Sequence, residues 1–547
     1  MNKQYLLWKE QINLEDYLQE EINKMSEIEI EECFGKDLEF GTAGLRGVLG
    51  AGTNRMNIYV VRKITIGLAM YLKEKYPNEK ISVAIAYDSR NFSKEFMEIV
   101  TKVLATYEIY SYVYDDVKPT PLLSYLLRKK QSKAGIMITA SHNPKEYNGY
   151  KVYNETGCQI NEEEAREITK KIATIDDMFN FEYKNNVNDY VTIIKEEIED
   201  EYIKEIKKLS NNNLNKNIKI VFTPEHGTSY RVFPKLLNAC NYKNIINVEE
   251  QMMPDGNFSN TKSSNPEEEI AFELALEYAK NNDADLIIAN DPDADRLGIM
   301  CKKKIDNNEY IALTGNQTGT LMIDYLINNY QIDNNKIIYK TIVTGEMGAN
   351  IAKNKGIEIK ELLTGFKYIG EQIELLENKN NFLFGYEESY GYLINPIVRD
   401  KDALQAGLLI ADMCEYYKNE GITLYERLLA LYDEYGFYEE KTYSITLKGI
   451  DGIEKINNAI NYFRSNKLNN ILNIDINNQI DYLIDNTGLP KANVIKLYLK
   501  NYGWIVLRPS GTEPKLKIYI SIKEQSLEQA KSLNEKLYQE ILKIIGL

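Results

Sequence analysis

The stretch Leu286–Met300 reads LIIANDPDADRLGIM, an acidic loop between two apolar runs. The apolar, β-branched runs predict buried strands, and a loop that follows such a strand is a favoured place for a ligand. Alternate residues of an extended chain face the same side, so Asp291, Asp293 and Asp295 should converge. Three adjacent carboxylates repel one another unless a cation lies among them, and an all-oxygen site suits Mg²⁺. The alternative, an acidic surface turn, is disfavoured because apolar runs flank the loop directly.

Two other acidic motifs are excluded by their spacing. An EF-hand loop that starts at Asp291 needs Gly at position six and Glu at position twelve, where this chain has Arg296 and Lys302. An aspartyl-phosphate hydrolase motif of the D-x-D-x-Thr/Val kind would not have Asp295 as its fifth residue.

Short apolar runs alternate with amphipathic helical patterns along most of the chain. This rhythm predicts three similar α/β domains with mixed, helix-covered sheets, followed by a smaller C-terminal α+β domain. The expected domains are 1–210, 211–325, 326–440 and 441–547, with a polar linker at Ser210–Asn217 and a solvated helix pair before Glu39. The expected strands are Ile81–Tyr87, Ala134–Thr139, Ile218–Phe222, Leu286–Ala289, Ile337–Val343, Phe382–Phe384, Tyr443–Leu447, Trp504–Leu507 and Leu516–Ile522, and the expected helices include Phe92–Tyr107 and Ile453–Arg464.

Three further loops carry groups suited to binding. Thr139–Pro144 (TASHNP) is expected to direct a serine hydroxyl into a crevice. The alternative interpretation, a simple Ser-Asn-Pro turn, is about equally supported by this loop alone. Gly385–Tyr392 (GYEESYGY) combines carboxylates, a hydroxyl and aromatic rings, which suit a polyol. Arg508–Pro514 (RPSGTEP) offers a guanidinium, two hydroxyls and backbone N–H groups to a phosphate, whereas a plain hairpin turn would need no arginine.

Composition excludes several classes of protein. The 547 residues include 66 Lys and Arg against 81 Asp and Glu, and the net charge of −15 disfavours binding to nucleic acid or to an anionic membrane surface. Two histidines are too few for a multi-histidine metal site, and five scattered cysteines form no C-x-x-C pair. No apolar run reaches the length of a membrane span and no signal-peptide pattern is present, so we expect a cytoplasmic protein with reduced thiols.

Taken together, the four loops resemble the signatures of the α-D-phosphohexomutase superfamily, the phosphoglucomutases and phosphomannomutases. The resemblance runs from about Phe40 to Ile520 and includes FGTAGLRG at Phe40–Gly47, then TASHNP, DPDADR, EES and RPSGTEP in the family's order. It implies an enzyme of four domains around one central cleft, with one loop from each domain.

The resemblance also implies roles for individual residues. Ser141 is the expected phosphoserine, and Asp291, Asp293 and Asp295 are expected to hold Mg²⁺ together with its phosphate. The other implied site residues are the basic Arg46, Lys151, Lys401 and Arg296, with Lys401 and Lys151 as general acid/base candidates; Thr364, Gly365, Glu387 and Ser389 for the sugar; and Arg508, Ser510, Gly511 and Thr512 for the non-reacting phosphate. For His142, a contact with the phosphate and a hydrogen bond that orders the loop are equally supported.

The activity that the resemblance implies is the interconversion of glucose 1-phosphate and glucose 6-phosphate, with glucose 1,6-bisphosphate as intermediate and primer. The GYEESYGY form of the sugar loop is similar to the branch that holds bacterial α-phosphoglucomutases and animal phosphopentomutases. Mannose and pentose phosphates therefore remain alternative substrates. A metal-dependent sugar-phosphate phosphatase and a non-catalytic sugar-phosphate sensor are less favoured, and either a monomer or a homodimer is compatible with the sequence. Nucleotide-binding enzymes are disfavoured because neither a P-loop nor a strand-linked G-x-G-x-x-G motif is present.

Overall fold

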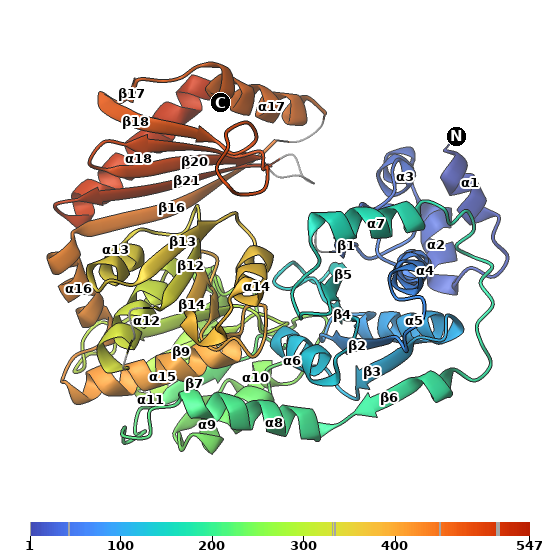
Figure 1. The fold of residues 1–547 in the computed structure, drawn as a ribbon, viewed down its shortest axis with the longest axis horizontal. Helices are drawn as coiled ribbons and strands as arrows, with labels where there is room; N and C mark the ends of the chain where they lie inside the picture. The colour runs from blue at the N-terminus through green and yellow to red at the C-terminus, as the bar shows by residue number, and fades with distance from the viewer. Residues whose placement is uncertain are drawn as a thin grey trace.

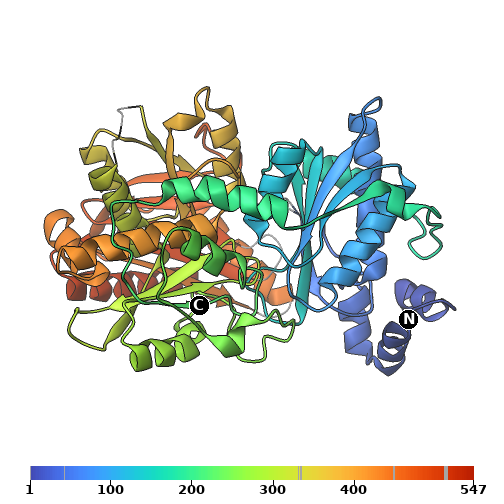
Figure 2. The same ribbon diagram turned by 90° about the horizontal axis from the view of Figure 1, so that it is seen from below.

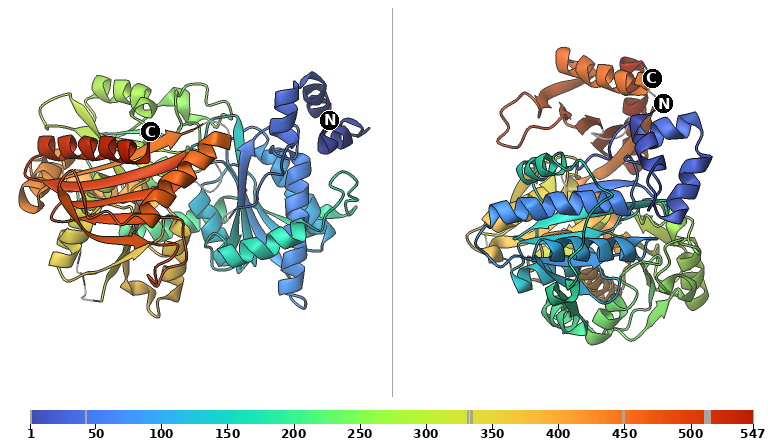
Figure 3. Two further views of the ribbon diagram at one scale, coloured as in Figure 1. Left: turned by 90° about the horizontal axis from the view of Figure 1, so that it is seen from above. Right: turned by 90° about the vertical axis from the view of Figure 1, so that its right-hand side faces the viewer.

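The computed structural model describes residues 2–41, 44–330, 332, 335–447, 450–509 and 515–546. The chain forms four sheets in sequence order, each covered by helices (Figure 1). The first sheet and its helices make one half of the molecule, while the second and third sheets make the other half, with the fourth sheet beside the third (Figures 1 and 3). The expected four-domain α/β architecture with mixed sheets is confirmed.

Three short helices, not a helix pair, precede the first sheet: α1 (Lys3–Lys9), α2 (Asp16–Lys24) and α3 (Glu27–Phe34). They are also less solvated than expected, because Trp8 and Ile22 are completely buried. The Trp8 ring packs edge-on against Tyr59, with 5.6 Å between ring centroids. The polar surface of these short helices hides a small apolar face that packs on the first domain.

The first sheet is mixed, with strand order β1-β5-β4-β2-β3-β6. Its strands are β1 (Gly44–Val48), β2 (Ser82–Tyr87), β3 (Tyr110–Tyr114), β4 (Ala134–Ile138), β5 (Tyr147–Asn154) and β6 (Val191–Ile194). Its helices are α4 (Ile58–Lys75), α5 (Ser93–Thr106), α6 (Thr120–Lys130) and α7 (Glu162–Ile172). The next helix, α8 (Glu196–Ile206), packs against both α6 and α9 (Val232–Ala239), so it joins the two halves of the molecule (Figure 2).

The second and third sheets repeat the same mixed pattern, with strand orders β11-β10-β9-β7-β8 and β13-β12-β14-β15. The strands of the second sheet are β7 (Ile220–Thr223), β8 (Ile245–Asn247), β9 (Leu286–Asn290), β10 (Leu297–Lys302) and β11 (Tyr310–Leu313), with helices α9, α10 (Glu249–Met252) and α11 (Glu273–Asn282). The third has β12 (Ile337–Thr341), β13 (Glu358–Leu362), β14 (Phe382–Glu387) and β15 (Gly391–Leu393), with helices α12 (Gly315–Asn329), α13 (Met347–Asn354), α14 (Phe366–Leu375), α15 (Ala403–Asn419) and α16 (Leu424–Tyr435).

The fourth sheet differs because all its strand pairs are antiparallel, in the order β16-β21-β20-β19-β18-β17. Its strands are β16 (Phe437–Thr446), β17 (Asn470–Ile471), β18 (Ile474–Asp481), β19 (Ile495–Leu499), β20 (Gly503–Pro509) and β21 (Lys515–Glu524), with helices α17 (Ile450–Ser465) and α18 (Leu527–Ile545). The boundary expected at residue 441 falls inside β16, because that strand pairs with β21 from Phe437 onward.

All four loops singled out in the sequence lie between strands that pair antiparallel. The pairs are β4–β5, β9–β10, β14–β15 and β20–β21. In the first three sheets the strand before the loop also pairs parallel with an inner strand. The loops therefore leave the carboxyl end of a buried strand, and the chain returns at once along the same sheet.

The segment Ser210–Asn217, expected to be a polar linker, is bound to α15. The Lys216 ammonium contacts the Asp412 carboxylate, which also accepts hydrogen bonds from the Tyr242 hydroxyl at 2.7 Å and from the Asn211 backbone N–H at 2.6 Å. Both Lys216 and Asp412 are buried. The sequence predicts a linker here because the carboxylate that binds this polar segment lies about 200 residues further along the chain.

Among the described residues, no helix combines the length and apolar character that crossing a membrane requires. All five cysteines are buried and free.

Replacing Asp412 with Ala should destabilise the protein strongly. The change leaves a buried ammonium without its counter-charge, which costs about 3–5 kcal/mol in comparable cases. Urea denaturation followed by circular dichroism measures the effect. Glu20→Ala is the control, because the Glu20–Lys24 pair is 73% and 77% exposed and should contribute little. Equal midpoints for the two variants would contradict a structural role of the Asp412 contact.

Candidate active site

The loops of the first two domains meet at Ser141 and Asp291, which are 150 residues apart in sequence. The Ser141 hydroxyl donates a hydrogen bond to Asp291 Oδ2 over 2.7 Å and lies 3.2 Å from His142 Nδ1. Ser141 has a left-handed backbone with φ of 54°, and its N–H donates to Thr139 Oγ1 at 2.8 Å. A non-glycine residue in this region is strained, which is frequent where a side chain must be presented for function.

The three aspartates of the second-domain loop converge as the sequence predicted. One carboxylate oxygen from each of Asp291, Asp293 and Asp295 lies within 4.8 Å of the others, and all three residues are buried. Asp293 Oδ1 and Asp295 Oδ1 have no hydrogen-bond partner among the described residues. Buried, unpartnered carboxylate oxygens at this spacing fit a divalent cation with oxygen ligands.

Two lysines from other domains neutralise the aspartates. Lys151 Nζ of β5 lies 2.7 Å from Asp293 and 3.2 Å from Asp295, and Lys401 Nζ lies 3.2 Å from Asp295. Burial opposes the charged form of each group, but these contacts lower the pKa of Asp295 and raise the pKa values of Lys151 and Lys401. Asp291 has no lysine partner in the described part of the chain, and burial together with repulsion from Asp293 and Asp295 raises its pKa well above the ordinary value.

Arg46, Arg296 and His142 each contact the serine loop or the acidic loop. Arg46 Nη1 donates to Asn143 Oδ1 at 2.6 Å, which ties β1 to the serine loop. The Arg296 side chain is paired with Glu267, and its backbone N–H donates to Asp291 Oδ1 at 2.9 Å. Desolvation, with repulsion from Arg296 and Arg46, lowers the pKa of His142 well below its ordinary value, so its ring is neutral at pH 7.

The sugar-loop candidates of the third domain lie next to this cluster. Glu387 accepts a hydrogen bond from the Gly365 backbone N–H at 2.9 Å, so the loop that holds Thr364 and Gly365 is in contact with β14. Ser389 is half-buried in the turn after β14. The Leu297 backbone N–H donates to the Tyr390 carbonyl at 3.1 Å, which joins the acidic loop of the second domain to the sugar loop of the third.

Arg508 stands half-buried at the end of β20. The Arg508 charge acts near the acidic and sugar loops, as the pKa of Lys517 on the neighbouring strand shows. Burial lowers this pKa, and repulsion from Arg508 and Arg296 lowers it further. The Glu267 and Glu388 carboxylates raise it and so oppose the shift. Ser510, Gly511 and Thr512 lie outside the described residues. Their expected part in a phosphate cradle therefore remains a prediction.

The structure adds positioning groups that the sequence analysis did not single out. The Thr120 hydroxyl donates to Asp293 Oδ2 at 2.9 Å, and its N–H donates to the Asp293 carbonyl at 2.8 Å. Asp400 contacts the Lys401 ammonium at 3.1 Å and accepts hydrogen bonds from the Tyr153 hydroxyl and the Gln159 amide, each at 2.8 Å. Thr120 begins helix α6 between two prolines, a pattern that marks a helix start but says nothing of a partner 173 residues away.

The turn after β7 supports the acidic loop from behind. The Thr228 N–H donates to the Pro292 carbonyl at 2.8 Å. In the same turn Glu225 is completely buried, and neither carboxylate oxygen has a hydrogen-bond partner among the described residues. Burial raises the pKa of Glu225 to about 8, and Thr261 nearby opposes the shift. Glu225 is thus held as a neutral acid over much of the neutral pH range.

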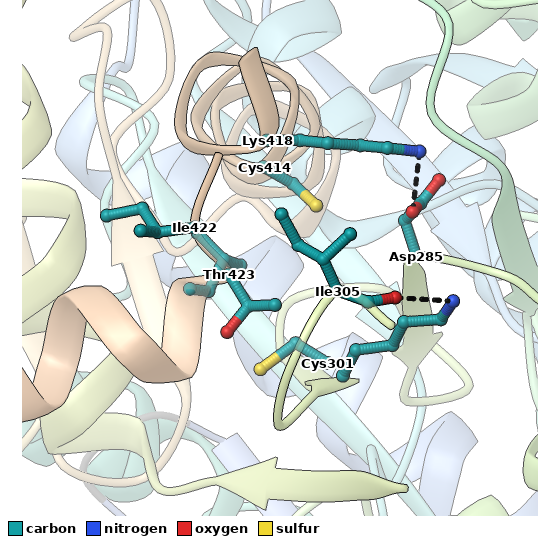
Figure 4. Close-up of a pocket in the computed structure, with 9 residues that line it drawn as sticks. Asp285, Cys301, Ile305, Cys414, Lys418, Ile422 and Thr423 are labelled. Carbon is teal, nitrogen blue, oxygen red and sulfur yellow. Dashed lines mark hydrogen bonds and ion pairs between the residues drawn. The ribbon is translucent and has the colours of Figure 1, made fainter. Parts of the chain in front are cut away.

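A small cavity beside α15 is distinct from this cluster (Figure 4). Cys301, Cys414 and Ile305 are among the residues that line it, and the Lys418–Asp285 ion pair lies at its side. Its volume is about 20 Å³, enough for roughly one water molecule and far too small for a sugar phosphate. Burial raises the pKa of Cys301 to about 12, so this thiol is unreactive at neutral pH.

Four models of one protein family match the chain in consecutive order. The phosphoglucomutase/phosphomannomutase alpha/beta/alpha domains I, II and III match residues 37–178, 200–304 and 314–435, and the phosphoglucomutase/phosphomannomutase C-terminal domain matches residues 483–539.

Curated relatives and solved structures are similar over most of their lengths. A phosphoglucomutase of Staphylococcus haemolyticus (strain JCSC1435) is 40% identical over 91% of this chain and 93% of its own, and one of Staphylococcus aureus (strain MSSA476) is 38% identical over 97% and 98%. A putative phosphomannomutase from Thermus thermophilus superposes with a TM-score of 0.71 at 18% identity, covering 94% of this chain and 100% of its own. The open form of parafusin, a phosphoglucomutase from Paramecium, has a TM-score of 0.69 at 18% identity, covering 93% and 95%. The two structures share the fold.

Glu225→Gln should change how stability depends on pH. The folded-state pKa of about 8 lies above that of a free glutamate, so the folded protein binds more protons than the unfolded chain between the two values. Wild-type stability should therefore fall as pH rises from about 5 to about 8, and the variant should remove this part of the decline. Thermal unfolding measured across this pH range tests it, with Glu249→Gln on the exposed start of α10 as control. Identical pH profiles for wild type and Glu225→Gln would be the contrary result.

Proposed function

The chain belongs to the phosphoglucomutase/phosphomannomutase family, and we propose that it interconverts glucose 1-phosphate and glucose 6-phosphate through a phosphoserine at Ser141. The observation that carries the proposal is the Ser141 hydroxyl at 2.7 Å from Asp291, inside a cluster of three buried carboxylates. A divalent cation held by these carboxylates would offset the negative charge of a phosphate on this serine. The reaction is an isomerisation, because the phosphate ends on another hydroxyl of the same sugar.

Asp291, Asp293 and Asp295 are the proposed ligands of Mg²⁺, because their oxygens converge and two carboxylate oxygens, Asp293 Oδ1 and Asp295 Oδ1, have no hydrogen-bond partner among the described residues. When bound, the cation neutralises the carboxylates and shields the charge on the phosphoryl oxygens. Ser141 carries the phosphoryl group and His142, as a neutral ring 3.2 Å away, contacts it or orders the loop. Arg46 and Arg296 supply positive charge on the remaining sides.

The phosphoryl group moves in two transfers, and the bonds and protons of the two steps balance. In the first, the bond between phosphorus and the Ser141 oxygen breaks as a bond to the free sugar hydroxyl forms. A lysine ammonium gives a proton to the leaving Ser141 oxygen, and the proton of the sugar hydroxyl restores that ammonium. Lys401 and Lys151 are the candidates, since both lie among the aspartates. The bisphosphate then turns around, and its other phosphate returns to Ser141. The lysine ammonium gives a proton to the leaving sugar oxygen and takes up the proton that the Ser141 hydroxyl loses.

The third and fourth domains are proposed to hold the sugar in both orientations. Glu387, Ser389, Thr364 and Gly365 are placed to bind hydroxyl groups, and Thr364 Oγ1 has no hydrogen-bond partner among the described residues. We propose that Arg508 grips the phosphate that is not reacting, together with Ser510, Gly511 and Thr512. Glucose 1,6-bisphosphate is the proposed primer, because it can phosphorylate Ser141 of an enzyme that has lost its phosphate.

Phosphomannomutase and phosphopentomutase activities use the same chemistry and are the main alternatives. The curated relatives, named phosphoglucomutases at 38–40% identity, favour glucose. A sugar-phosphate phosphatase is disfavoured by the second phosphate cradle that the sequence predicts at Arg508–Pro514, and a non-catalytic sensor by the retention of Ser141 and all three aspartates. A cytoplasmic location and a monomeric or homodimeric state stay predictions.

The purified protein should carry partial phosphorylation on Ser141, and Ser141→Ala should lose mutase turnover. Intact mass with peptide mapping detects the phosphate. A coupled assay with glucose 1-phosphate, mannose 1-phosphate and ribose 1-phosphate, each with and without bisphosphate primer, measures turnover. Glucose 1-phosphate should give the highest kcat/KM. Near-normal turnover in Ser141→Ala would refute the phosphoserine mechanism, and a higher kcat/KM for another sugar would assign a different substrate.

Mg²⁺ should stabilise the wild-type protein, and Asp293→Asn should abolish the effect because it removes one of three ligands. A cation at 100 times its Kd stabilises a protein by about 2.7 kcal/mol, which thermal unfolding detects without any activity assay. Glu163→Gln, at an exposed position of α7, is the matched control and should retain the Mg²⁺ response. An equal response in the Asp293 variant would place the cation elsewhere.

A further inference from the structure

Arg90 follows β2 in the turn Asp88-Ser89-Arg90 and is buried, with 3% of its surface exposed. Its guanidinium is aimed at the backbone of the serine loop and does not contact the Ser141 hydroxyl. One nitrogen, Nη2, donates to the carbonyls of Ser141 and Asn143, each at 2.5 Å. The other, Nη1, donates to the carbonyls of Pro144 and Tyr147, each at 2.9 Å.

These four hydrogen bonds extend along the loop from Ser141 to the first residue of β5, Tyr147. A guanidinium has five N–H donors in a rigid plane, so it can hold four carbonyls in one fixed arrangement. Lysine has three donors on a flexible stem and cannot reproduce this arrangement. The Ser141 backbone is in the left-handed region, which persists only where the surroundings hold it there. Arg90 helps to hold this backbone conformation, because it donates hydrogen bonds to carbonyl groups of the loop.

Arg90 is itself held in place from two sides. Asp88 Oδ2 lies 3.3 Å from Arg90 Nε, and Asp88 Oδ1 accepts hydrogen bonds from the Arg90 backbone N–H at 3.0 Å and the Ser93 hydroxyl at 2.7 Å. The Arg90 guanidinium also lies over the Phe258 ring, 5.0 Å from its centroid. Phe258 belongs to the second domain, so the support of the serine loop reaches the domain that supplies the aspartates.

We infer that Arg90 is a positioning residue for phosphoryl transfer, which locks the serine loop so that the Ser141 oxygen meets the aspartate cluster. The expected effect of Arg90 on catalysis rests on the proposed function. The structural part of the inference, that Arg90 orders the loop from Ser141 to Tyr147, does not depend on any activity. Misplacing a reacting group by about 1 Å can cost about 100-fold in rate, so loss of the four contacts should lower kcat by a similar factor. KM should change little, because the proposed sugar and distal phosphate contacts come from the third and fourth domains.

Arg90→Met and Arg90→Lys test the inference in the full-length protein. Hydrogen–deuterium exchange of the peptide that covers 139–147 should be faster in Arg90→Met than in wild type, with Arg90→Lys in between. Steady-state kinetics should show a kcat reduced by about 100-fold in Arg90→Met, with KM nearly unchanged. Phe258→Leu, which keeps all four carbonyl contacts, should change exchange and kcat only slightly.

Arg62→Met is the matched control. Arg62 is another buried arginine of the first domain that donates to backbone carbonyls, those of Met178 and Phe179, at 3.1 and 3.0 Å. Its loss should lower the unfolding temperature but leave 139–147 exchange and kcat unchanged. Unchanged loop exchange in both Arg90 variants, or an equal fall of kcat in Arg62→Met, would overturn the inference. If Arg90→Met does not fold, the exchange and the kcat/KM split of Arg90→Lys decide. Absence of mutase turnover in wild type would refute the proposed function, while the exchange data would still test the loop.

Discussion

Mutual repulsion among three buried carboxylates is the constraint on which the rest of the site depends. Their oxygens lie within 4.8 Å of one another in a place that water does not reach freely. The first domain supplies Lys151 and Thr120 to them, and the third supplies Lys401. Three domains must therefore be assembled before these charges are balanced. The electrostatics of the site thus depend on how the domains are placed relative to one another. The same carboxylates provide the oxygen ligands that a hard divalent cation prefers.

The four loops singled out in the sequence share one structural arrangement. Each loop joins two antiparallel strands, and in the first three domains the first strand also pairs parallel with an inner strand of its sheet. Both ends of a loop are thus fixed by the same sheet, which limits the conformations that the loop can adopt. A loop held in this way can keep a strained residue such as Ser141, provided that side chains behind it, Arg90 above all, satisfy its carbonyl groups.

The fourth domain is bound to the third by buried charges. Lys340 Nζ of β12 lies 2.8 Å from Glu346 and 3.0 Å from Glu361, and Trp504 of the fourth sheet donates to Glu346 at 3.0 Å. Lys496, also from the fourth sheet, donates to the Ile342 carbonyl at 2.8 Å, and burial lowers its pKa to about 8. Charged groups buried with such defined partners favour one relative placement of two surfaces, which suits a domain whose Arg508 is proposed to bind the same substrate as Ser141.

The sequence by itself determined the local features: the strand–loop units, the converging aspartates and the chemical character of each loop. These follow from period-two patterning and from residues that act within a few positions of one another. The family resemblance already implied that Ser141 lies beside the three aspartates. Only the tertiary structure decided that the Ser141 hydroxyl bonds to Asp291, that Ser210–Asn217 is bound by α15, and that Arg90 holds the serine loop. The physical reason is that a distance between remote residues depends on how whole domains pack, and no local pattern records that packing.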